Sequence, residues 1–298
     1  MQTARCRREK LRRLPWQQVA AHAWSHTYLQ VARTFILPHI DISSLKELPG
    51  TNPAALPPPA TLAASNVYST AESILAAWLE AQVKKMLPRA ARRIVAFDSG
   101  LHDCVAFCAA VAAHWPPAVR ALQQLALPTA NAAVSAADCR ANARVLLAML
   151  DDLQCPLRTA GPEPLSAERV ATAHCADMVL LSAYLFSWLP QLIPRSTIEF
   201  SGKLQESQTQ MVEISNPSKK AISYSVRLQG HVDFSLDQQS LRVEAGCTAA
   251  CAVQCKPSTG VTQSAYLVLA SRRDGAAVAA TLVFQLVSKV QPTRPLQF

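Results

Sequence analysis

The spacing of apolar residues divides the chain into a helical part and a strand-rich part. From about Val67 to Pro190 the apolar positions recur every three or four residues, which is the period of one buried helix face. After Pro194 the period falls to two, as expected for strands that bury every second side chain. The pattern therefore predicts two folded modules that meet between Pro190 and Ser196.

Four amphipathic helices are predicted in the first part. The first opens near Ala71, Asp98 or Ser99 is expected to cap the second, and the last ends at Pro190. Four apolar stripes of this kind bury one another in a compact bundle. The stripes are Ile74, Leu75, Trp78 and Leu79; Leu101, Val105, Cys108 and Ala112; Cys139, Ala143, Leu146, Leu150 and Leu153; and Cys175, Met178, Ser182, Leu185 and Leu189.

Seven short strands are predicted in the second part, at intervals near ten residues. Asn-Pro, Gly and Asp-Gly turns separate them, and Asp274-Gly275 is the clearest hairpin turn. This arrangement predicts an antiparallel β-sandwich. The expected strands are residues 197–200, 211–214, 222–228, 240–244, 249–255, 265–270 and 279–287.

The N-terminal region is predicted to be a basic arm, a helix and a linker. The helix is expected from Trp16 to Leu37, and five prolines between Pro49 and Pro59 predict an extended linker. The apolar face of that helix is expected to consist of Val19, Ala23, Tyr28, Val31, Phe35 and Ile36. The predicted divisions are the arm and helix at 1–48, the linker at 49–65, the helical domain at 66–194, the sandwich at 196–290 and a tail at 291–298.

The net charge of +9 is concentrated near the N-terminus. Residues 1–60 hold eight Lys or Arg against three Asp or Glu. Such a run favours an acidic partner, namely a nucleic acid, an anionic membrane or the acidic tails of tubulin, or else it is a solvated basic segment. Nucleic acid is disfavoured because no aromatic residues are interleaved with the charges. The basic arm consists of Arg5, Arg7, Arg8, Lys10, Arg12 and Arg13, which face only Glu9.

A second basic cluster follows the first predicted helix of the bundle. It lies between two apolar stripes, so it is expected to form one exposed basic edge that binds a filament. The alternative is a solvated helix end, where cations interact favourably with the helix dipole. The basic edge is defined as Lys84, Lys85, Arg89, Arg92 and Arg93.

Catalytic and metal-binding chemistry is not expected. The eight glycines form no phosphate-binding loop, and no nucleophile motif is present. Cys247, Cys251 and Cys255 are interpreted as small core residues instead of zinc ligands, since paired CxxC spacing and a clear fourth ligand are missing. We expect no enzyme activity, cofactor, metal or small-molecule substrate. Nine scattered cysteines, without an apolar leader or a run of eighteen apolar residues, favour a reducing cytoplasmic compartment and no membrane span.

The helical part resembles a calponin-homology domain. The resemblance rests on Trp78 in the first helix, the basic turn after it, and the stretch 97–103, which reads Phe-Asp-Ser-Gly-Leu-His-Asp. Cys139-Arg140-Ala141-Asn142 before a Leu-rich helix and the closing segment 178–186 extend it. One departure is Cys104, which stands where the family usually has Gly. The resemblance implies an all-α bundle with a possible affinity for filaments.

The strand-rich part resembles the ASH (Hydin-type) family of immunoglobulin-like domains. The resemblance is carried by Ile214-Ser215-Asn216-Pro217, then by 222–226 and 234–236, and by 281–286 in the last strand. It spans about ninety residues, and no Cys pair flanks a Trp in it. The expected fold class is therefore α+β multidomain, an all-α calponin-homology-like bundle followed by an all-β sandwich.

The two modules in this order resemble long structural proteins of cilia and flagella. The resemblance implies a non-catalytic cytoskeletal component of the axoneme, in its central apparatus, that supports cilium motility. Its expected partners are tubulin in microtubules and neighbouring axonemal proteins, and not nucleic acid or membrane. The alternative is a cytoplasmic actin-binding adaptor with a single calponin-homology domain.

Overall fold

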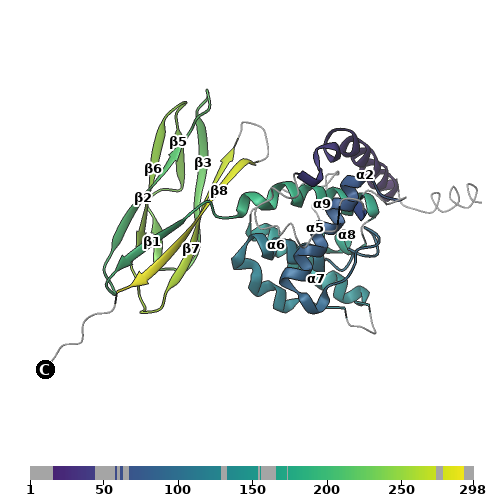
Figure 1. Cartoon of the computed structure of the whole chain (residues 1–298), viewed down its shortest axis with the longest axis horizontal. Coiled ribbons are helices and arrows are strands. Elements are labelled where there is room, and N and C mark those ends of the chain that lie inside the picture. Colours follow the sequence, from purple (N-terminus) through teal and green to yellow (C-terminus); the bar gives the residue numbers. More distant parts are fainter. Residues whose placement is uncertain are drawn as a thin grey trace, which may run out of the picture. The chain divides into compact units, whose positions relative to one another are not determined.

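A computed structural model describes residues 16–43, 58, 61–62, 67–128, 133–153, 155, 166–172, 174–272 and 278–291 (Figure 1). The chain divides into two compact units, Met1–Pro190 and Gln191–Phe298. The first unit is helical and the second is built from strands. Each has its own core, so each is described by itself.

The four predicted bundle helices are present, with shorter elements between them. The separate five-residue helix α8, capped by Ser166, precedes α9. The bundle helices are α5 (Thr70–Met86), α6 (Val105–His114), α7 (Ala136–Asp152) and α9 (Cys175–Trp188), with α8 at Ala167–Ala171. The 3-10 helices are η1 (Leu37–His39), η3 (Pro88–Ala90), η4 (Pro116–Gln124) and η5 (Leu189–Leu192).

The indole of Trp78 lies at the centre of the helical core and is fully buried. Its ring packs edge-on against Phe186 of α9 at 5.4 Å between centroids, and it lies tilted against the His114 ring of α6 at 5.9 Å. Aromatic contacts of this kind add specificity to the area that they bury. Burial lowers the pKa of His114, so this imidazole is neutral at physiological pH. The Trp78 side chain thereby joins three of the four bundle helices.

The N-terminal helix α2 (Trp16–Phe35) belongs to the helical unit. The predicted division at 48 and 66 placed it outside the bundle, but it packs against α9 (Figure 1). The predicted apolar face is also wrong. Ser25, Leu29 and Ala32 are buried, whereas the larger Tyr28 and Phe35 are exposed. The small residues allow a close approach to the bundle, which the aromatic side chains would prevent.

Glu72 connects α2 to the start of α5. One carboxylate oxygen accepts the Arg33 guanidinium at 2.7 Å, and the other accepts the backbone N–H and hydroxyl of Ser69, each at 2.8 Å. The Ser69 hydroxyl in turn accepts the Glu72 N–H, which completes a capping box. Ser25 adds a second link by donating to Asp177 of α9. Two polar contacts therefore fix α2 at both ends of its described, buried face.

The strand unit is a sandwich of a five-stranded and a three-stranded sheet. The five-stranded sheet has the order β1-β8-β7-β3-β5, and the other has the order β2-β6-β4. Every predicted strand is present, and the short β4 is an addition. The strands are β1 (Thr197–Gly202), β2 (Gln208–Ser215), β3 (Ile222–Gly230), β4 (Phe234–Leu236), β5 (Ser240–Val243), β6 (Thr248–Cys255), β7 (Gln263–Arg272) and β8 (Val278–Val290).

The sandwich is not wholly antiparallel. Strand β1 pairs with β8 in parallel, with Thr197 opposite Gln285 and Gly202 opposite Val290. Alternation along single strands carries no information on which strand lies beside which, so the sequence could not reveal this pairing. The antiparallel pairing of β7 with β8 agrees with the predicted hairpin. Its turn, Asp274-Gly275, lies outside the described residues.

Alternate residues of both sheets form the core between them. Phe200 and Phe234 meet edge-to-face there at 5.7 Å, and Cys251 and Cys255 are completely buried. These two thiols are core residues, as predicted, and burial raises the pKa of Cys255 to about 11. Cys247 differs, because it precedes β6 and is exposed.

Asn216 organises the turn between β2 and β3 and is 1% exposed. Its amide nitrogen donates to the carbonyls of Lys220, Val243 and Glu244, at 2.9–3.1 Å. Its side-chain oxygen accepts the N–H and the hydroxyl of Ser218. The Asn-Pro turn seen in the sequence thus contains a buried hydrogen-bond network, which joins three segments of the sandwich.

One span among the described residues, Cys175–Leu192, is long and apolar enough to cross a membrane by length and composition. The sequence pattern predicted no such span. Of this stretch, 56% is buried inside the protein, and α9 turns Met178, Val179 and Leu185 into the helical core. Burial of this extent is typical of a helix in the core of a folded domain.

We predict that the two units fold independently. Fragments 1–190 and 191–298 should each melt cooperatively, with helical and β-rich circular dichroism respectively, because each contains a complete core. A fragment 61–190 should melt at a lower temperature than 1–190, since it loses the packing of α2. A spectrum without secondary structure from either of the two long fragments would contradict the boundary.

We predict that Glu72→Gln destabilises the protein in a pH-dependent way. Burial by itself raises the pKa of Glu72, but hydrogen bonds from Arg33 and Ser69 outweigh it and hold the pKa below 4.5. The carboxylate therefore stabilises the fold above that value, and this contribution disappears as the pH falls through the folded-state pKa. Urea unfolding should show a loss of about 1–3 kcal/mol at pH 7.

The loss caused by Glu72→Gln should shrink as the pH falls through the lowered pKa of Glu72, because the parent carboxyl then becomes protonated as well. Glu168→Gln is the matched control, because the exposed Glu168 forms only a 3.5 Å pair with Arg140. A Glu72→Gln loss that is the same at every pH would show that the charge of Glu72 is not what stabilises α2.

Candidate functional site

The basic edge is formed where α5 ends and the chain turns toward α6. Lys84 and Lys85 lie in the last turn of α5 and are exposed. Arg89 lies in η3 and Arg93 in the extended segment after it, and both are also exposed. Four of the five predicted cations are therefore exposed on the helical unit, within residues 84–93.

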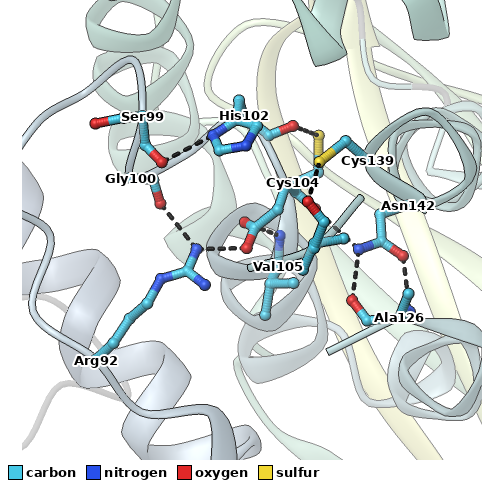
Figure 2. A network of polar contacts seen from close by, with 11 residues as sticks. Arg92, Ser99, Gly100, His102, Cys104, Val105, Ala126, Cys139 and Asn142 are labelled. Carbon is cyan, nitrogen blue, oxygen red and sulfur yellow. Dashed lines mark hydrogen bonds and ion pairs between the residues drawn. The ribbon is translucent and has the colours of Figure 1, made fainter. Parts of the chain in front are cut away.

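The fifth predicted cation, Arg92, is turned into the protein. Its guanidinium forms an ion pair with Asp103 and donates to the Gly100 carbonyl at 3.0 Å (Figure 2). The side chain of Arg92 is 32% exposed, against 3% for Asp103. A buried carboxylate requires such a partner. Arg92 thus belongs to the core network that supports the basic edge, and its assignment as a binding residue is corrected.

The extended segment that carries Arg93 is held from both ends. The Ile94 N–H donates to the Glu80 carboxylate of α5 at 2.6 Å, and the Phe97 N–H donates to the Tyr68 hydroxyl at 3.4 Å. The rings of Tyr68 and Phe97 also meet edge-to-face at 5.3 Å. Burial raises the pKa of Glu80, because the charged form loses hydration. The cations are thereby presented by a fixed backbone.

Asp103 and Asn142 join the turn to α6 and α7. Asp103 accepts the Val105 N–H at 3.2 Å, which satisfies a free donor at the start of α6. Asn142, which is completely buried in α7, donates to the carbonyls of Asp103 and Ala126, and its oxygen accepts the Ala126 N–H (Figure 2). Both hydrogens and the oxygen of the amide are used. Three segments far apart in sequence are therefore fixed by one satisfied polar network.

The helix α6 begins later than the pattern predicts. Instead of a cap at Asp98 or Ser99, residues 98–103 form turns, and Cys104 adopts a left-handed conformation with φ of 60° before Val105. Gly100 is required in these turns, since a Cβ there would lie 2.5 Å from the Ala96 carbonyl oxygen. A residue other than glycine at positive φ is strained. The position at which the calponin-homology pattern has Gly is thus one where the backbone favours Gly.

The basic arm from Arg5 to Arg13 lies outside the described residues, so its surroundings are not defined. The structure brings together the other predicted site residues and separates Arg92 from them. Sequence reasoning missed Asp103 and Asn142 as supports of the edge. The signal available was the Asp at the end of the 97–103 stretch, but its ion pair with a particular Arg depends on the folded turn.

The thiols near this network are not arranged for chemistry. Burial raises the pKa of Cys104, Cys108 and Cys139, and nearby Asp103 adds to the effect, so the reactive thiolate is disfavoured. Among the described residues, no three His, Cys, Asp or Glu side chains are grouped to hold a metal ion. What the site offers is a fixed set of positive charges, suited to binding an acidic surface.

Comparison with known proteins identifies distant relatives in cilia. No protein-family model matches the chain. Cilia and flagella-associated protein 47 of Mus musculus is 26% identical over 225 residues, covering 70% of this chain and 7% of its own length. The Homo sapiens protein of that name is 22% identical over 294 residues, covering 90% and 9%. The chain is weakly homologous to these proteins and spans less than a tenth of their length.

Solved structures provide likenesses over about a third of the chain. The ASH/PapD-like domain 7 of human CEP192 has a TM-score of 0.28 and 12% identity, covering 33% of this chain and 82% of that one. SSP-19, an MSP-domain-like protein of Caenorhabditis elegans, has a TM-score of 0.26 and 9% identity, covering 30% and 92%. The assignment of an immunoglobulin-like sandwich rests on the strand order of the second unit. The resemblance of the helical unit to a calponin-homology domain stays a prediction.

We predict that glycine is tolerated better at position 104 than at 108. Both thiols are completely buried, so Cys→Gly removes the same side chain. Within α6, glycine at 108 adds a backbone cost of about 1 kcal/mol. At 104 it instead relieves a left-handed strain of about 1–2 kcal/mol. Urea unfolding should therefore show a smaller loss for Cys104→Gly, by about 2 kcal/mol. Equal losses would show that the positive φ is not strained.

Proposed function

We propose that this chain is a non-catalytic structural component of the ciliary or flagellar axoneme, in the central apparatus, where it supports motility. The observation that carries the proposal is the homology to cilia and flagella-associated protein 47, which extends over 70–90% of the chain. That protein is named for its association with cilia and flagella, and this relationship suggests a cilium-related role here. The placement in the axoneme is more specific than that name, and it is our proposal.

Attachment to microtubules is proposed to use the two basic clusters. Tubulin tails are acidic, so the arm from Arg5 to Arg13 would attract them over long distances with little geometric demand. Single exposed charge pairs contribute only about 0–1 kcal/mol, but several acting together give appreciable binding. Lys84, Lys85, Arg89 and Arg93 of the basic edge would orient the helical unit, since their backbone is fixed. Neighbouring axonemal proteins are the second class of partner.

A structural role without catalysis is consistent with how the polar groups of the described residues are used. Buried acids such as Glu72 and Asp103 are engaged by cations and backbone N–H groups, and the buried thiols have raised pKa values. Side chains committed to holding segments together are typical of a scaffold. The proposal includes no cofactor and no small-molecule substrate.

We predict that microtubule binding depends on the arm and on ionic strength. Replacing the six Arg and Lys residues of the arm with Ser should weaken co-sedimentation several-fold and flatten its salt dependence. The physical reason is that salt screens such attraction beyond about 8–10 Å. Replacing Lys84, Lys85, Arg89 and Arg93 with Ser should have a smaller effect in solution and a larger one in the assembled axoneme.

The control variant replaces four exposed cations elsewhere with Ser, namely Arg120, Arg144, Lys219 and Lys220. It has the same net charge as the edge variant, so a difference between them reports position and not total charge. Arg92 is left intact because it is needed by Asp103. If the arm variant bound microtubules as well as the parent does at low salt, the arm would not be the binding site, and attachment in the axoneme would have to depend on contacts with neighbouring proteins. Co-sedimentation with actin alone would favour the actin-adaptor alternative.

A further inference from the structure

The segment 91–96, which follows η3, has the form of a strand although it pairs with no strand among the described residues. Its backbone is extended at Ala91, with φ of −62° and ψ of 123°. Exposure then alternates along it: Ile94 is buried, whereas Arg93 and Val95 are exposed, and Val95 is 75% exposed. A period of two is that of a strand with one face on the core.

One backbone edge of this segment is held and the other is free. In a strand, the N–H and C=O groups of successive residues point to opposite edges. The Ile94 N–H donates to the Glu80 carboxylate at 2.6 Å, so the edge of residue 94 faces α5. Arg93 and Val95 lie on the other edge, and no described residue pairs with their N–H or C=O groups. Such an edge is a template for a further strand.

Positive charge surrounds the free edge. Arg93 belongs to it, and Lys84 lies one helical turn after Glu80 on the side of α5 that holds the segment. The acids nearby are already engaged. Glu80 accepts the Ile94 N–H, and Asp98 accepts the Ser99 N–H at 2.6 Å. The four exposed cations of the basic edge therefore favour an acidic ligand.

The free backbone groups and the charge together select the kind of ligand. A lipid surface provides no peptide groups to pair with. A second copy of the chain, paired along the same edge, would bring two sets of cations together, and like charges on paired strands are unfavourable. A disordered acidic segment has neither defect, because it can become a strand when it binds.

We infer that residues 91–96 bind an acidic segment of a partner as an added strand, through backbone hydrogen bonds to Arg93 and Val95. In antiparallel pairing, each of these residues exchanges two hydrogen bonds with the residue opposite. A Glu opposite Arg93 lies on the same face as the guanidinium, which gives a favourable cross-strand pair. The inference rests on the proposed function, in which the segment is a tubulin tail, and it specifies how the basic edge recognises that tail.

The test compares two fluorescein-labelled peptides that differ only in their backbone. Both are Glu-rich and about twelve residues long, and the second has N-methyl groups on its central residues, which remove N–H donors without changing the charge. Attraction to the basic arm depends on charge and is the same for both. Fluorescence anisotropy with the full chain at about 0.15 M salt should show the methylated peptide binding more weakly, by about tenfold.

The variant Val95→Pro removes the N–H donor of the free edge. An extended residue whose N–H has no partner suits proline, so the fold should be retained, as circular dichroism can check. The variant should weaken the unmethylated peptide by about fivefold or more and leave the methylated peptide nearly unchanged, because pairing is already lost there. The matched variant Val95→Ala shortens the same side chain but keeps the N–H, so it should weaken binding by only about twofold.

Equal binding of the two peptides to the parent protein would overturn the inference, whatever the stability of Val95→Pro, because it would show that charge alone is recognised. Equal effects of Val95→Pro and Val95→Ala would overturn it as well. Both results would leave microtubule attachment through charge intact.

Microtubules separate the inference from the proposed function. Removal of the acidic tails by limited proteolysis should weaken co-sedimentation of the parent, and unchanged binding would show that the tail is not the ligand. The expected peptide results without co-sedimentation on intact microtubules would support strand pairing and overturn the proposed attachment to microtubules.

Discussion

The helical unit depends on a carboxylate that must be buried with its charge neutralised. Asp103 lies where the turn after the basic edge meets α6, and at 3% side-chain exposure it has almost no contact with water. Arg92 provides the opposite charge at one carboxylate oxygen, and the Val105 N–H donates to the other. The side chain of Asn142 donates to the backbone carbonyl of the same residue. Removing one partner of such a group costs far more than the pair contributes. The turn, the start of α6 and the middle of α7 therefore depend on the same buried contacts for their stability.

The same principle separates structural cations from available ones. Arg33 and Arg92 are each paired with an acid that is almost fully buried, Glu72 and Asp103, and so they hold helices and turns in place. The exposed cations of the basic edge have no comparable role among the described contacts and are free to meet a partner. Along the chain, Arg92 and Arg93 are indistinguishable neighbours. In the folded protein, Arg92 forms an ion pair with the buried Asp103 and Arg93 is exposed.

The binding proposed for microtubules relies on charge. The basic edge and the basic arm would act through long-range electrostatic attraction, which salt weakens and which demands little shape complementarity. Single exposed charge pairs contribute little, so several cations would have to act together.

The sequence by itself determined where helices and strands form, because periods of 3.6 and 2 follow from burying one face of each element. It located the four bundle helices, seven of the eight strands among the described residues, and the exposed lysines in the last turn of α5. Tertiary structure decided which face of α2 is buried, since Ser25, Leu29 and Ala32 fit against α9 where Tyr28 and Phe35 would not. It also decided the parallel pairing of β1 with β8, the left-handed turn at Cys104 and the inward orientation of Arg92. Each of these depends on a partner that is distant in sequence, and local periodicity contains no information about that partner.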